Sequence, residues 1–231
     1  MEHINTLIEI LKTGNEDDSW LATDEPKEIA WRTPSIITSL LPLLKDSNSI
    51  VRSNTADVLG GMEELAKSTV PYLIPLLKDS TPFVRCSAAG ALGNIGESAK
   101  LAIPHLIPLL EDSEIGVRIE TAQALGNMGE LDKSAIPQLI LLLRDLDSSV
   151  RRNAEHTLGN MGESAKSAVP YIIPLLKDPS SFVRTLAAQA LGEIGESAKS
   201  AIPALTLLLE DADQGVRSST EMALERIGVK H

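Results

Sequence analysis

The sequence predicts an all-α solenoid of about seven two-helix units, each 33 residues long. Proline recurs with this step at Pro71, Pro104, Pro137, Pro170 and Pro203. A valine-arginine pair follows the same step without insertion or deletion, at Val51–Arg52, Val84–Arg85, Val117–Arg118, Val150–Arg151, Val183–Arg184 and Val216–Arg217. A fixed period of this length is typical of stacked units that bury a continuous core only against their neighbours.

The composition agrees with helices packed closely on helices. Hydrophobic residues make up 43% of the chain and aromatic residues only 3%, so the core must consist of Leu, Ile, Val and Ala. The formal net charge of -11 opposes binding to a phosphate backbone, and we expect no nucleic-acid partner. The single cysteine, Cys86, excludes an internal disulfide and a multi-cysteine metal site.

The unbroken period predicts one elongated domain over residues 1–231, with a degenerate unit at 1–33 and six regular repeats at 34–231. The first unit carries many acidic residues, and we interpret it as a polar cap on the open end of the array. Trp20 and Trp31 lie in it, so a partner-binding patch is the alternative. No apolar run approaches the length of a membrane helix and no signal peptide is visible, so we expect a cytoplasmic protein without a membrane partner.

Within one repeat, residues 71–78 predict the first helix, since Leu73, Ile74, Leu76 and Leu77 form one apolar stripe. A second proline, Pro75, lies four residues after Pro71. An interior proline removes a hydrogen bond and collides with the carbonyl group one turn back. The helix should therefore begin near Pro71 or bend at the second proline.

Residues 82–95 predict the second helix, with an N-cap column two residues after the aspartate that ends the first helix. Val84, Ala88 and Leu92 give this helix a buried face, and Gly96 suits a left-handed C-cap. A further glycine column passes through Gly93 in the helix interior, where glycine costs about 1 kcal/mol relative to alanine. We expect close approach between successive repeats to offset that cost.

The run Pro-x-Leu-Ile-Pro-Leu-Leu-x-Asp, the Val-Arg pair and the ending Ala-Leu-Gly-x-Ile/Met-Gly resemble HEAT repeats, specifically the HEAT-like type named after the phycobilisome lyases. The resemblance covers residues 34–231 and implies a right-handed α-α superhelix. It also implies that the recurring aspartate and arginine side chains bond within and between units as a structural ladder. This assigns Asp79, Arg85, Asp112, Arg118, Asp145, Arg151, Asp178 and Arg184, with Asp46, Arg52, Asp211 and Arg217 at the ends.

Columns that vary between repeats are free to serve binding. On the second helix, the positions 2, 6 and 10 residues after the valine share one face because of their four-residue spacing, and the resemblance places the second helices on the concave side. These groove columns contain Asn94, Ile119, Gln123, Asn127, Arg152, His156, Asn160, Thr185, Gln189 and Glu193, with Cys86, Gly90, Ser218, Met222 and Arg226. The face is expected to be neutral and amide-rich, which suits a protein surface or a peptide backbone.

The leading hypothesis is a noncatalytic scaffold that holds a protein or peptide in this groove. No catalytic residue, metal site or cofactor is expected, since the four histidines are not spaced for a metal and no nucleophile accompanies His156. The alternative that the family resemblance implies is a bilin lyase or chromophore-handling chaperone acting with a partner subunit. Two further interpretations stay open: a solvated face without a ligand, and a consensus-like, engineered or assembly array.

Overall fold

The computed structural model describes residues 8–12, 35–128, 135–160 and 166–229. The chain divides into two compact units, residues 1–128 and 129–231, and each is considered by itself. Within the described ranges all regular secondary structure is helical. The predictions for the first repeat, including Trp20 and Trp31, fall mostly outside these ranges, and the single continuous solenoid stays a prediction.

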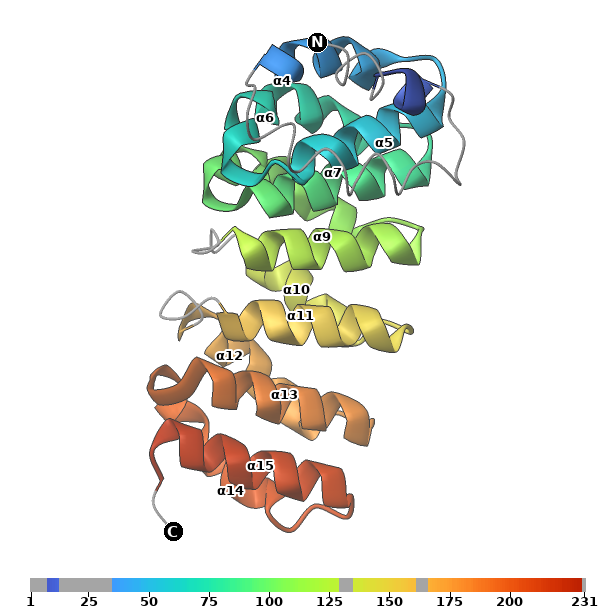
Figure 1. Cartoon of the computed structure of the whole chain (residues 1–231). Coiled ribbons are helices and arrows are strands. Elements are labelled where there is room, and N and C mark those ends of the chain that lie inside the picture. The colour runs from blue at the N-terminus through green and yellow to red at the C-terminus, as the bar shows by residue number, and fades with distance from the viewer. Residues whose placement is uncertain (1–7, 13–34, 129–134, 161–165, 230–231) are drawn as a thin grey trace. The chain divides into compact units, whose positions relative to one another are not determined.

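The first unit contains three described repeats, each with a short first helix and a longer second helix (Figure 1). The first helices are α4 (Ser35–Leu40), α6 (Val70–Leu73) and α8 (Ile103–Leu106). The second helices are α5 (Ser49–Gly60), α7 (Pro82–Ile95) and α9 (Ile115–Asn127), and they lie side by side in this order.

The second unit has the same plan. Its first helices are α10 (Ile136–Leu142), α12 (Val169–Ile172) and α14 (Ile202–Leu208). Its second helices are α11 (Ser148–Asn160), α13 (Ser181–Ile194) and α15 (Gln214–Ile227), again side by side. The all-α repeat fold that the 33-residue period predicts is therefore confirmed.

The second helix of a repeat forms because small and branched apolar residues recur on one side. In α7, Val84, Ala88 and Leu92 are four residues apart and fully buried. Pro82 occupies the first turn, where its missing N–H does no harm. The helix closes at Gly96, whose φ of 68° lies in the region that favours glycine.

The first helix changes geometry where the sequence carries a second proline. α6 continues as a 3₁₀ helix at Ile74–Lys78, with Pro75 in its first turn. Leu141 and Leu207 replace this proline in two repeats, and there α10 and α14 each run as α-helix for seven residues. Because proline lacks the N–H and crowds the preceding turn, the predicted bend takes the form of a change from α to 3₁₀ geometry.

Segments between one repeat and the next are also helical, which the apolar periodicity does not predict. They form 3₁₀ helices of seven residues at Glu63–Thr69, Gly96–Ala102 and Gly195–Ala201. Their buried alanines, such as Ala99 and Ala102, anchor them to the core. The repeat is therefore a hairpin of two helices followed by a 3₁₀ connection.

The glycine column inside the second helices is confirmed as a site of close helix approach. A Cβ atom on Gly60 would lie 2.6 Å from the Cα of Ala91, and one on Gly93 would lie 2.5 Å from the Cα of Ala124. Real Cβ atoms do not approach this closely, so glycine is needed for the two backbones to meet. The cost of glycine in a helix is offset by the packing that it permits.

Candidate functional site

Three arginines of the Val-Arg pairs, at Arg52, Arg85 and Arg184, join their repeat to the aspartate of the next repeat. Arg85 donates from Nε and Nη2 to the two carboxylate oxygens of Asp112, both at 2.8 Å, and from Nη1 to the backbone carbonyl of Asp79 at 2.9 Å. Arg52 makes the same two-pronged contact with Asp79. Such forked pairs fix geometry as well as charge, so these residues hold the fold together.

Arg184 and Asp211 repeat this arrangement in the second unit, at 2.8 Å for both prongs. Hydrogen bonds from Arg184 and from the backbone N–H of Asp213 hold the pKa of Asp211 below its ordinary value. The N-cap column is used only in part, because the side chains of Thr81 and Ser180 make no capping bond. In all six described repeats, with or without a capping bond, the ladder aspartate accepts the N–H of the cap residue, at Asp46, Asp79, Asp112, Asp145, Asp178 and Asp211.

Arg151 departs from the predicted ladder. It donates to the backbone carbonyls of its own repeat, but Asp178 pairs with Arg144 at 2.9 Å. The guanidinium of Arg151 lies 4.4 Å from the centre of the Phe182 ring, a cation-π contact. Arg144 occupies the same repeat position as Lys45, one residue before the ladder aspartate. The ion pair with Asp178 is therefore made by an arginine outside the Val-Arg column.

The groove columns of the first unit reach the surface as predicted from their spacing. Asn94, Gln123 and Asn127 are exposed, and Ile119 is half-buried. The lone Cys86 thiol is half-buried, and burial raises its pKa to about 11, so it stays protonated at neutral pH.

The groove columns of the second unit surround a pocket. Arg152, His156 and Glu193 are exposed, while Thr185 and Gln189 are half-buried. The side chain of Asn160 lies outside the described residues. Four of these groups line the pocket, Arg152, Thr185, Gln189 and Glu193, whereas His156 does not.

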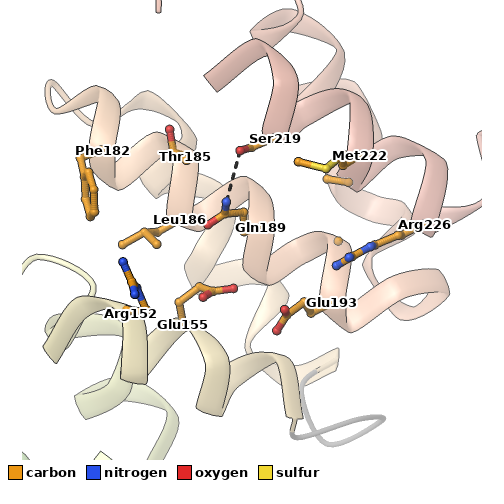
Figure 2. Close-up of a pocket in the computed structure, with 12 residues that line it drawn as sticks. Arg152, Glu155, Phe182, Thr185, Leu186, Gln189, Glu193, Ser219, Met222 and Arg226 are labelled. Carbon is orange, nitrogen blue, oxygen red and sulfur yellow. Dashed lines mark hydrogen bonds between the residues drawn. The ribbon is translucent and has the colours of Figure 1, made fainter. Parts of the chain in front are cut away.

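The pocket has a volume of about 420 Å³ and lies across α11, α13 and α15 (Figure 2). Its apolar lining includes Leu186 and the partly exposed Phe182 and Met222, which are 44% and 47% exposed. Gln189 donates to Ser219 at 3.4 Å. The lining consists of Arg152, Glu155, Phe182, Thr185, Leu186, Gln189, Gly192, Glu193, Ser219, Met222, Ala223 and Arg226.

Glu155 is a charged pocket residue that the groove columns do not contain. It is 7% exposed and has no hydrogen bond or ion pair with any residue in the described ranges. Burial, with the neighbouring charge of Glu193, raises the pKa of Glu155 to about 7. The sequence held a signal for it, because the same column contains buried alanine in four other repeats, at Ala56, Ala89, Ala122 and Ala188.

The first unit also holds carboxylates on its second helices, at Asp57 of α5 and Glu120 of α9. Burial raises the pKa of Asp57 to about 6 and raises the pKa of Glu120. Ser87 donates to Asp57 at 3.1 Å and lies 3.2 Å from Ser53. Carboxylates therefore accompany the amides in both units, which the prediction of a neutral, amide-rich face did not include.

Comparison with protein families decides the family of the chain. A model described as HEAT repeats matches residues 37–126, 103–167 and 136–225, which together span most of the sequence. The chain is a HEAT-repeat protein. A search of curated proteins gives no match.

Solved structures show the same fold as this HEAT array. An engineered protein is 28% identical over 83% of this chain and 96% of its own, with a TM-score of 0.59. A designed armadillo repeat protein in complex with the peptide (KR)4 is 20% identical over 82% and 98%, with a TM-score of 0.57. The CpcE–CpcF complex of phycocyanin lyase from Nostoc is 24% identical over 68% and 98%, with a TM-score of 0.50.

The described part of the HEAT array offers neither a membrane-spanning helix nor a cluster of metal ligands. No helix there is long and apolar enough to cross a membrane. No three His, Cys, Asp or Glu side chains there gather closely enough to hold a metal ion.

Proposed function

We propose that this HEAT array is a noncatalytic scaffold that holds another protein or a peptide on the face formed by its second helices. The observation that carries the proposal is the pocket across α11, α13 and α15. It offers partly exposed Phe182 and Met222 beside polar groups that can bond a peptide, such as Gln189. Apolar anchors with a few polar groups around them are typical of recognition sites.

The solved structures support this class of function. One of the similar structures, the designed armadillo protein, holds a peptide, and another, the phycocyanin lyase, is a complex of two chains. Solenoids present extended surfaces, because each repeat adds a further helix to the same face. A peptide can then be read by successive repeats through its backbone and side chains.

Selection of peptides from a random display library against the full-length chain tests the proposal. Gln189→Ala and Met222→Ala are each expected to weaken a selected peptide about tenfold, measured by calorimetry, with little change in the melting temperature. Leu207→Ala is the matched control, since Leu207 is 71% exposed on α14 and outside the pocket lining. Equal loss in the control, or no selected peptide, would contradict the proposal.

A tetrapyrrole ligand is the second candidate, and it rests on the same pocket. Arg152 and Arg226 could each meet one propionate of a bilin, with Phe182, Leu186 and Met222 as apolar walls. Binding would shift the absorption band of a purified bilin mixed with the chain, and Arg152→Gln with Arg226→Gln would remove the shift. An unchanged spectrum eliminates this candidate and leaves the peptide scaffold.

A further inference from the structure

Glu155 breaks the rule that small residues separate neighbouring second helices. Its column contains alanine in four of the described repeats, all fully buried. Glu155 is nearly as buried, and its carboxylate points into the pocket (Figure 2). It has no partner among the described side chains or backbone groups. An unpaired buried carboxylate is unfavourable unless it takes up a proton or receives a cation.

Glu193 brings a second carboxylate to the same place. Gly159 of α11 stands in the glycine column, where Gly60, Gly93 and Gly192 face an alanine of the next helix. Gly159 faces the Glu193 side chain instead, and a Cβ atom on this glycine would overlap the carboxylate. The crossing of α11 and α13 therefore holds two carboxylates. Glu155 takes the place of alanine, and Glu193 stands in a column that contains asparagine at Asn94 and Asn127.

The arrangement of charges in the pocket favours a cation. The carboxylates of Glu155 and Glu193 face each other from α11 and α13, while Arg152 and Arg226 lie on opposite sides of this pair (Figure 2). None of the four has an ion pair within the described ranges. A ligand carboxylate would meet one guanidinium at a time beside two like charges, whereas a cation between the glutamates would meet two opposite charges.

We propose that the pocket receives one basic side chain, arginine or lysine, of the partner, with its cationic end between Glu155 and Glu193. This inference rests on the proposed scaffold function and specifies its partner. The aliphatic stem of such a side chain would lie along Leu186 and Met222. The net charge of -11 on the chain also attracts basic partners over longer distances.

Binding of the basic side chain is coupled to loss of a proton from Glu155. Its pKa of about 7 reflects burial and Glu193 of α13, opposed by Arg152 of α11 and Arg226 of α15. A bound cation lowers this pKa, so it binds the ionised form more tightly. The affinity should therefore increase about tenfold between pH 6 and pH 8, as the free pocket becomes ionised.

Methyl NMR of the full-length chain with labelled methionine tests the inference. N-acetyl-arginine methylamide and N-acetyl-lysine methylamide are the basic probes, and N-acetyl-glutamate methylamide is the acidic one. A basic probe should shift the Met222 resonance in a saturable manner, more tightly at pH 8. Glu155→Gln should weaken it about tenfold at pH 8 and remove the pH dependence. Glu221→Gln is the control, since Glu221 occupies the same column but is exposed on α15.

Tighter binding of the glutamate probe, or an arginine probe unaffected by Glu155→Gln, would overturn the inference. Circular dichroism checks that each variant is folded. The scaffold function is judged separately, by peptide selection. Selected peptides that bind the pocket without a basic residue would overturn only the basic-side-chain inference. A pocket that holds the arginine probe in a chain that selects no peptide would contradict the scaffold instead.

Discussion

Glu155 should make the stability of the protein depend on pH. Its pKa rises from 4.5 in the unfolded chain to about 7 in the folded protein. Between these values the folded state keeps a proton that the unfolded state has released, so stability falls as pH rises through this window and is level above it. Glu155→Gln should remove up to about 3 kcal/mol of this fall, measured by urea unfolding at pH 4.5 and pH 8.

Asp57 also makes the stability of the protein fall as pH rises, since burial raises its pKa from 3.8 to about 6. Some pH dependence will therefore remain in Glu155→Gln, and the comparison must be with the wild-type chain. Glu221→Gln should leave the pH profile of the wild type unchanged because Glu221 is exposed. A profile that is identical in the Glu155 and Glu221 variants would contradict this account of Glu155.

Gly93 should not tolerate a side chain. A Cβ atom there would meet the Cα of Ala124 at 2.5 Å, and backbone cannot move aside as a flexible side chain can. Gly93→Ala is therefore expected to destabilise the protein by about 2 kcal/mol in chemical denaturation. Gly116→Ala in α9 meets no atom within 4 Å, and it should be neutral or stabilise by up to about 1 kcal/mol. Similar losses from both substitutions would contradict the close-approach explanation.

At the level of elements, the two-pronged ion pair of Arg85 with Asp112 should contribute more to the free energy of unfolding than an exposed ion pair does. The Arg85 and Asp112 side chains are only 14% and 11% exposed, and Arg85 also bonds two backbone carbonyls of its own turn. Arg85→Ala leaves Asp112 without its partner and should cost about 2–3 kcal/mol in urea unfolding. Lys100→Ala removes only an exposed pair with Glu97 and should stay within about 0.5 kcal/mol. Equal effects would show that the ladder contributes no special stability.

The second helices were predictable because each residue in them obeys a strict helical spacing. Val84, Ala88 and Leu92 determine which side is buried, and this leaves the groove columns outside. The 3₁₀ connections were not predictable in the same way, since a segment such as Gly96–Ala102 has no helical apolar stripe. Its geometry follows from two alanines that pack on the core, which is a tertiary effect.

The pocket was only half predictable from the sequence. Arg152, Gln189 and Glu193 follow from the spacing of exposed columns. Glu155 does not, because its column carries fully buried alanine in four other repeats and so belongs to the packed side of the helix. The exception was visible as a glutamate in a column that holds alanine in four other repeats, but its burial and its approach to Glu193 depend on how α11 and α13 cross.

At the scale of the whole molecule, the unbroken period predicts that all internal repeats unfold together. Each repeat buries its core against like neighbours, so interface energies should be similar along the array. Hydrogen exchange measured by mass spectrometry at increasing urea should then give one midpoint for the amides of α7 and α13, which lie in different compact units. Two separate midpoints would show instead that residues 1–128 and 129–231 fold as independent domains. Glu155→Ala sharpens the test, because it restores the alanine of the other repeats at the α11–α13 crossing. If the array is one cooperative body, this substitution should raise the urea midpoints of α13 and α7 together. If the two units unfold independently, it should raise the midpoint of α13 alone.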